Sequence, residues 1–411
     1  MTRHSAILVG NETLTQQCGE VILSRGHDIS CVITHSLDVA NWARSKGLHV
    51  AAYSDDLGGI SADWLLSVAN LEVLSRDILA RAKLAVNFHD GPLPRYAGLN
   101  APVWAIMNGE SHHGITWHVI DAGIDEGDIL EQRLFEIAAD ETALTLNTRC
   151  FEVALESFPT LLTQLETGRI TRQPQDLAQR SLYRRADRPS NFGHLDFTRN
   201  AEEIVRLVRA LDHGSYWNPM TTAKISIGNQ VLSVRHAEVF AAKAATGEVA
   251  SQDGTGLVIG CHGGAVRLEG FFSEKIRADM VLASELPHSV DVVEENVGQA
   301  ALRAAKSEHR LHKLLLDLKP ASISTTLGDE DWQSLSLNAA LEDLAIAAVH
   351  SLGEGSLDLA LSSEGLPGYV SHWRPLSVQT NGTVAEARAR LDLSWKSGFA
   401  LDLLSRDKRL S

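Results

Sequence analysis

Short apolar runs alternate with amphipathic segments over the first 180 residues of the chain. Runs with the length and composition of buried strands occupy residues 5–10, 28–34, 48–53, 62–69 and 84–89. Helical spacing of apolar positions fills residues 11–26 and 37–47, and both segments end at a glycine. This order predicts an α/β domain over residues 1–180, with a mostly parallel sheet and right-handed crossovers.

The pattern changes beyond residue 180. A helical segment at 200–212 is followed by short alternating segments between residues 223 and 271, separated by turns that contain glycine. Short strands at near-regular spacing are typical of a small β-barrel or sandwich. We therefore assign a second domain to residues 181–290.

Residues 291–411 differ again and indicate a third, α+β module. Helical stretches at 302–318 and 335–352 precede the segments SLDLALSSEG and VSHWRPLSVQT. The last residues, RDKRLS, carry no helix cap, so we expect the chain to be a fragment of a longer protein.

Composition narrows the class of protein. Of the 411 residues, 44% are hydrophobic and 22% are charged, which excludes wholesale disorder. No apolar run reaches the length of a membrane span and the N-terminus lacks the pattern of a secretory signal, so no membrane partner is predicted. The net charge of −15 opposes a large contact with nucleic acid.

The chain has four widely spaced cysteines and no C-x-x-C motif: Cys18, Cys31, Cys150 and Cys261. This spacing indicates buried, unpaired side chains and predicts a cytoplasmic location.

The turn after the first predicted strand argues against a dinucleotide site. It reads G-N-E-T-L instead of G-x-G-x-x-G, and Glu12 occupies the place of a pyrophosphate. The sequence therefore predicts a Rossmann-like sheet that binds no dinucleotide.

The densest polar cluster at a strand end is VNFHDGPLPRYAGLNAPVW, residues 86–104. Because side chains alternate along a strand, Asn87 and His89 should point together into the crevice beyond the strand ends. A second segment, GITWHVIDAGIDEGDIL, predicts a strand followed by an acidic turn. Four carboxylates of this turn are candidates to orient His89: Asp121, Asp125, Glu126 and Asp128.

An amide, an imidazole and a carboxylate together suit acyl transfer to an amine. The amide can stabilise an oxyanion and the imidazole can move a proton. Because the sequence has neither a G-x-S-x-G motif nor a convincing nucleophilic cysteine, direct attack by the amine is the simplest scheme. Adjacent His112 and His113 are interpreted as surface residues, since no third ligand stands at metal spacing, and we predict no metal site.

The segments NFHDGPLPRYAG and GITWHVIDAGIDEGDIL together resemble the 10-formyltetrahydrofolate-dependent formyltransferases. That family carries N-x-H before a proline-bearing loop and L-D-x-G downstream. Asn87 and His89 match the first motif, and Asp125 in I-D-E-G matches the second. The resemblance implies that these three residues are catalytic and that 10-formyltetrahydrofolate is the co-substrate.

The resemblance also implies a folate pocket. Its backbone contacts would come from LEVLS and from the acidic turn, at Glu72, Val73, Leu74, Asp121, Gly123 and Ile124. Thr116 and His118, on the strand before Asp125, would support the catalytic groups. The chain departs from the family at Gly91, where relatives often have a serine, and this affects the expected hydrogen bonding of the loop.

Residues 181–290 resemble the C-terminal, OB-like domain of methionyl-tRNA formyltransferase. This stretch holds 12 Lys/Arg and 12 Asp/Glu, and the helix at 37–47 runs directly into the next strand, leaving no room for the tRNA-gripping insertion of that family. Both observations argue against tRNA as a partner.

Residues 291–411 resemble part of a condensation domain of nonribosomal peptide synthetases, through VSHWRPLSVQ and FALDLLSRDKRL. No H-H-x-x-x-D-G motif is present, so no condensation activity is assigned. A formyltransferase domain ahead of synthetase modules is known in linear gramicidin synthetase.

These resemblances imply formyl transfer to an amino or hydroxylamino group of an amino-acid unit, free or on a carrier protein, in nonribosomal peptide or siderophore biosynthesis. Downstream synthetase modules would be partners, and an arginine cluster offers a docking patch for an acidic carrier or a solvated linker: Arg184, Arg185 and Arg188. Two alternatives remain open. One is a sugar-amine or methionyl-tRNA formyltransferase, and the other is an inactive docking scaffold.

Overall fold

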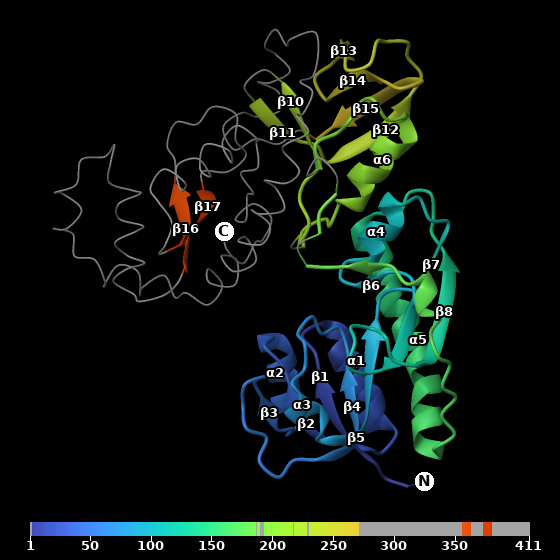
Figure 1. The fold of residues 1–411 in the computed structure, drawn as a ribbon, viewed down its shortest axis with the longest axis vertical. Helices are drawn as coiled ribbons and strands as arrows, with labels where there is room; N and C mark the ends of the chain where they lie inside the picture. The colour runs from blue at the N-terminus through green and yellow to red at the C-terminus, as the bar shows by residue number, and fades with distance from the viewer. Residues whose placement is uncertain are drawn as a thin grey trace, which may run out of the picture. The chain divides into compact units, whose positions relative to one another are not determined.

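A computed structural model describes two compact units, Met1–Arg185 and Ala186–Ser411 (Figure 1). The described residues are 2–185, 187–189, 193–216, 218–227, 230–270, 356–362 and 373–379.

The first unit is built on a seven-stranded sheet in the order β3-β2-β1-β4-β5-β7-β8. Its strands are β1 (Ser5–Val9), β2 (Asp28–Ile33), β3 (Val50–Ala51), β4 (Ala62–Ser67), β5 (Ala82–His89), β7 (His112–Val119) and β8 (Ile129–Glu136). The first five strands of this order run parallel, and β7 and β8 join as antiparallel strands. The predicted α/β fold with a mostly parallel sheet is confirmed, although the third predicted strand shortens to two residues.

Helices and one short second sheet complete this unit. The helices are α1 (Thr13–Ser24), α2 (Leu37–Ser45), α3 (Arg76–Leu79), α4 (Ala101–Met107), α5 (Ala143–Thr167) and the 3₁₀ helix η1 (Leu177–Gln179). The side chain of Ser36 caps α2, and Thr142 and Thr145 form a capping box on α5. The second sheet pairs β6 (Ala97–Gly98) with β9 (Leu182–Tyr183).

Alternation along the strands divides the core between the two faces of the sheet. Val86 and Phe88 of β5 and Trp117 of β7 pack with α1 and α5 in one cluster. Burying a side chain of this size contributes about 1.5–3 kcal/mol, so this cluster fixes the register of β5. Asn87 and His89, which alternate with these residues, consequently face away from α5.

The second unit holds one described helix and three antiparallel arrangements. The helix α6 (Ala201–Ala210) begins with a capping box of Asn200 and Glu203. A four-stranded sheet has the order β12-β15-β14-β13, and two hairpins pair β10 with β11 and β16 with β17. The strands are β10 (Lys224–Ile227), β11 (Gln230–Ser233), β12 (His236–Phe240), β13 (Val249–Gln252), β14 (Gly256–Cys261), β15 (Gly264–Glu269), β16 (Ser356–Ser362) and β17 (Trp373–Gln379).

These elements agree in position with the predicted helix and short strands. The helical stretches predicted at 302–318 and 335–352 lie outside the described residues. All four cysteines are buried and free, as predicted. Among the helices that the structure describes, none is both long and apolar enough to cross a membrane.

Candidate active site

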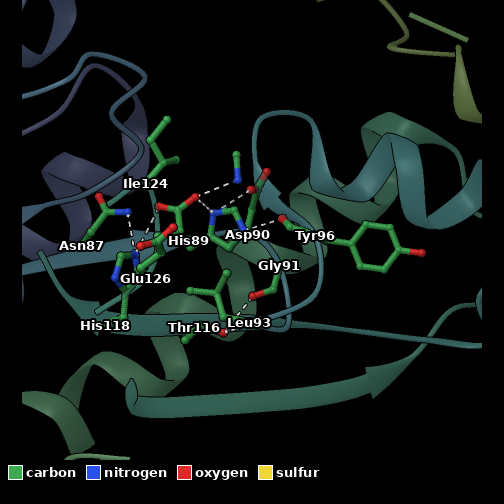
Figure 2. Close-up of polar contacts among 12 residues, drawn as sticks. Asn87, His89, Asp90, Gly91, Leu93, Tyr96, Thr116, His118, Ile124 and Glu126 are labelled. Carbon is green, nitrogen blue, oxygen red and sulfur yellow. Dashed lines mark hydrogen bonds and ion pairs between the residues drawn. The ribbon is translucent and has the colours of Figure 1, made fainter. Parts of the chain in front are cut away.

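The polar cluster lies where β5 is flanked by β4 and β7. In the sheet register, Asn87 is opposite Ser67 on β4 and His118 on β7, and His89 is opposite Thr116. Figure 2 shows Asn87, His89, Thr116 and His118 on a common face of these strands. The alternation predicted from the sequence therefore brings the amide and the imidazole together.

The ring of His89 is buried and its orientation is fixed by the backbone. Its Nε2 lies 2.7 Å from the carbonyl oxygen of Tyr96. Because a carbonyl can only accept, Nε2 donates, and Nδ1 carries the lone pair of the neutral ring. Nδ1 lies 3.6 Å from Oδ2 of Asp125 and 3.8 Å from Oδ1 of Asp90. His89 can thus take a proton on Nδ1 beside two carboxylates.

His118 connects the amide to the acidic turn. Its Nδ1 donates to the carbonyl of Val119 at 2.9 Å, and its Nε2 lies 3.2 Å from Nδ2 of Asn87. In the neutral ring, Nε2 accepts one of the two N–H groups of the Asn87 amide. Protonated Nε2 would instead form an ion pair with Oδ1 of Asp125, at 3.4 Å.

Asp125 is the carboxylate of the acidic turn that reaches this cluster. It adopts a left-handed backbone conformation, with φ of +55°, and its Oδ2 accepts the N–H of Gly98 at 2.8 Å. Burial opposes the charged form, but His89, His118 and the Gly98 N–H outweigh it and lower the pKa of Asp125. The turn also depends on Gly127, because a Cβ there would lie 1.9 Å from the carbonyl oxygen of Val119.

Thr116 holds the proline-bearing loop against the sheet. Its hydroxyl donates to the carbonyl of Gly91 at 2.8 Å and accepts from the N–H of Leu93 at 3.2 Å. The side-chain amide of Gln132 also donates to the hydroxyl oxygen of Thr116, at 3.0 Å. Gly91 is needed here, since a Cβ would lie 2.7 Å from Nε2 of His89. The loop that presents Tyr96 to His89 is therefore fixed at its start.

Comparison with known proteins identifies the family. Residues 12–162 match the family described as formyl transferase, and residues 189–280 match its C-terminal domain. The methionyl-tRNA formyltransferase of Anaeromyxobacter dehalogenans is 31% identical over 248 residues, which are 56% of this chain and 77% of that protein. The chain belongs to the formyltransferase family. A second relative, the methionyl-tRNA formyltransferase of Geobacter metallireducens, is 28% identical and shares 57% of this chain and 72% of its own length.

Solved structures show the same fold as this family member. An N-formyltransferase from Helicobacter canadensis, in complex with folinic acid and dTDP-3-aminofucose, has a TM-score of 0.52 at 19% identity. The similarity covers 66% of this chain and 100% of that one. HypX from Aquifex aeolicus, in complex with tetrahydrofolic acid, has a TM-score of 0.50 at 16% identity and covers 75% of this chain and 58% of its own.

The residues expected to line a folate pocket in this formyltransferase lie in two loops. Glu72, Val73 and Leu74 follow β4, and Val73 is 89% exposed. The side chain of Asn70 accepts from the N–H of Glu72 and donates to its carbonyl, which leaves Val73 and Leu74 as the better candidates for ligand contacts.

The other side of the expected pocket is the turn after β7. Gly123 packs against Glu126, Ile124 is exposed, and Asp121 is exposed and accepts the N–H of Ala122. Leu74 and Ile120 pack against the same hydrophobic cluster, so both loops rest on one face of the sheet. Val73 and Ile124 are exposed apolar side chains of these two loops.

The site also contains residues that the sequence analysis missed. Asp90 and Tyr96 contact His89, although nothing in their local pattern signals this role. His113 was predicted at the surface, and this was wrong. It is 1% exposed and its Nε2 donates to the carbonyl of Asp90, because β7 begins at His112 and turns alternate side chains inward. Burial lowers the pKa of His113 to about 4.

The turn between β1 and α1 is bonded to neighbouring segments through the side chain of Asn11. Oδ1 of Asn11 accepts from the hydroxyl of Thr34 and the N–H of His35, and its amide donates to the hydroxyl of Tyr53. A Cβ on Gly10 would lie 1.9 Å from the carbonyl oxygen of Val68.

Within the described residues, no group of three or more His, Cys, Asp or Glu side chains is arranged to hold a metal ion.

Proposed function

We propose that this chain transfers the formyl group of 10-formyltetrahydrofolate to a primary amine, through Asn87, His89 and Asp125. The observation that carries the proposal is the placing of these groups. The lone pair on Nδ1 of His89 and the amide of Asn87 face the same side of the sheet, and Asp125 lies within 3.6 Å of His89 and 3.4 Å of His118. Relatives named formyltransferases and structural neighbours with bound folates support it.

The residues divide the chemistry between them. When bound, 10-formyltetrahydrofolate supplies the formyl carbon, to which the acceptor amine adds directly. An N–H of Asn87 donates to the formyl oxygen as negative charge develops on it. Nδ1 of His89 takes a proton from the attacking nitrogen, and ionised Asp125 stabilises the imidazolium. His89 then returns the proton to the nitrogen that leaves as tetrahydrofolate.

The proposal extends to the class of molecule that accepts the formyl group. Equal numbers of basic and acidic residues in 181–290, together with the likeness of 291–411 to a condensation domain, support an amino-acid unit in nonribosomal peptide or siderophore assembly. The names of the relatives favour methionyl-tRNA, and the dTDP-3-aminofucose bound to one structural neighbour favours a sugar amine. The OB-like barrel, the carrier and synthetase partners and the cytoplasmic location remain predictions.

An assay of tetrahydrofolate release separates these acceptors. The purified chain would be incubated with 10-formyltetrahydrofolate and, in turn, an amino acid, an N-hydroxylated amino acid, a nucleotide-linked amino sugar and methionyl-tRNA. Formylation of the amino acid or hydroxylamine supports the proposed acceptor, whereas a clear preference for the sugar or tRNA selects that alternative. No release with any of them would favour the docking scaffold.

The catalytic assignment makes a direct prediction. Replacing Asn87 or His89 with alanine should lower turnover by about 10²–10³, because a preorganised donor or base is lost. Both variants should bind a folate analogue in calorimetry and keep the circular dichroism of the unmodified chain. Near-normal turnover in both would contradict the assignment.

A further inference from the structure

The segment 173–185, which we call the strap, follows α5 and contacts the turn that carries Asp125. The backbone of Gln173 pairs with that of Ile129 in both directions, at 2.8 and 2.9 Å. Further along, β9 pairs with β6. Most side chains of the strap between these pairings are exposed, but those of Gln175 and Arg180 are half-buried. These two side chains therefore point from an exposed segment toward the site.

Gln175 and Arg180 bind the backbone of the turn that carries Asp125. Nε2 of Gln175 donates to the carbonyl of Asp125 at 2.8 Å and to that of Gly127 at 2.7 Å. A guanidinium nitrogen of Arg180 donates to the carbonyl of Ile124 at 2.6 Å. The strap thus binds the backbone carbonyls of Ile124, Asp125 and Gly127.

Asp125 has a backbone conformation that few residues with a side chain adopt. Its φ is +55°, in the left-handed region, which aspartate enters more readily than most residues but still uncommonly. The same conformation brings the carboxylate to Gly98, His89 and His118. If the turn relaxed to a commoner conformation, the carboxylate would lose these contacts.

The strap holds the partner of the carboxylate as well. Gly98, whose N–H donates to Asp125, belongs to β6, and the N–H of Leu99 donates to the carbonyl of Tyr183 in the strap. Donor and acceptor of this hydrogen bond are consequently fixed by one segment. We propose that Gln175, with Arg180, is a positioning residue that holds the Asp125 carboxylate beside His89 by binding the backbone of its turn.

This inference rests on the proposed function, and its test separates the two. Gln175→Met keeps the side-chain length and removes both donated hydrogen bonds. Gln179→Met makes the same change at an exposed position of the strap and is the matched control. We expect Gln175→Met to lower kcat about 10- to 10²-fold with a smaller change in KM, as for other small misplacements of catalytic groups. The control should keep normal values.

A double-mutant cycle with Asp125→Asn tests whether Gln175 acts through the carboxylate. If it does, adding Gln175→Met to Asp125→Asn should cause less than a further twofold loss, because the group being positioned is already disabled. Losses that multiply would overturn the proposal, as would unchanged kcat in the single variant.

Amide hydrogen exchange gives a readout that needs no activity. The Gly98 N–H is protected by the Asp125 carboxylate, so Gln175→Met should raise its exchange rate about tenfold or more, while Gln179→Met should not. This measurement is valid even if the chain transfers no formyl group. Unchanged exchange at Gly98 in the Gln175 variant would refute the positioning role on its own.

Discussion

At the scale of single residues, one backbone carbonyl selects the reactive nitrogen of His89. Donation from Nε2 to Tyr96 leaves Nδ1 facing the carboxylates of Asp125 and Asp90. Burial raises the pKa of Asp90, whereas at Asp125 burial is outweighed by the neighbouring imidazoles, which lower the pKa. Asp125 is thus the carboxylate that is ionised over the wider pH range and the one that can stabilise a protonated His89.

Gly91 should not tolerate a side chain, because it lies against the His89 ring that donates to Tyr96. In Gly91→Ala the new Cβ would lie 2.7 Å from Nε2 of His89, so the ring must move and lose its bond to Tyr96. We expect kcat to fall about 10²-fold, the effect of a displacement near 1 Å. Gly59→Ala is the control, since its Cβ would meet no atom within 4 Å. Equal kcat in the two variants would show that the ring position is unimportant.

The buried His113 should make stability fall in acid. Its folded pKa of about 4 lies below the ordinary value of 6.5, so the unfolded chain binds the proton first as pH falls. The stability it contributes is complete above pH 6.5 and decreases by up to about 3 kcal/mol toward pH 4. Urea unfolding at pH 7.5 and 5 should show a smaller pH effect in His113→Gln than in the exposed His112→Gln. An equal effect in both would contradict this role.

Sequence reasoning reached some of these residues and not others, for a physical reason. The alternation rule is local, and it placed Asn87 and His89 on one face correctly. The choice of Asp125 among four nearby carboxylates came from the family motif, because residue pattern alone does not show which carboxylate a turn directs inward. Asp90 and Tyr96 act through contacts that only the folded loop creates.

At the scale of elements, the central strands β1, β2 and β4 were predicted best, because each is a short apolar run that is mostly buried on both faces. Strand β8 was not predicted, because only its first two residues are buried and it has no continuous apolar run. Helix α5 was not among the predicted elements, although Thr142 and Thr145 cap its start and Gly168 ends it. Pro159 inside it interrupts the expected pattern. The pairing of β6 with β9 could not be predicted, because two-residue strands far apart in sequence carry no periodic signal. Yet this pairing holds Gly98, and Gln175 of the strap holds the turn of Asp125, so together they fix both partners of the Gly98–Asp125 hydrogen bond.

At the scale of the whole molecule, the family matches and the catalytic elements occupy only part of the chain. Residues 12–162 and 189–280 match the two formyltransferase domains, and residues 291–411 lie outside both matches. Every group proposed to act on the formyl transfer lies in the first unit. None of these groups lies in residues 291–411, and we propose that this part of the chain serves the delivery of the acceptor.

Removing residues 291–411 should consequently separate catalysis from delivery. Formylation of a small soluble amine should keep a kcat/KM within about twofold of the full chain, because the site residues and both family-matched regions are retained. Formylation of an aminoacyl group on a carrier protein should slow more strongly, by about tenfold or more, if the missing part raises the local concentration of the carrier. Circular dichroism and thermal unfolding would first establish that the shortened chain is folded. If a folded truncation loses activity on the small amine, residues 291–411 help to form the site. If it loses none on the carrier-bound acceptor, the delivery role is wrong.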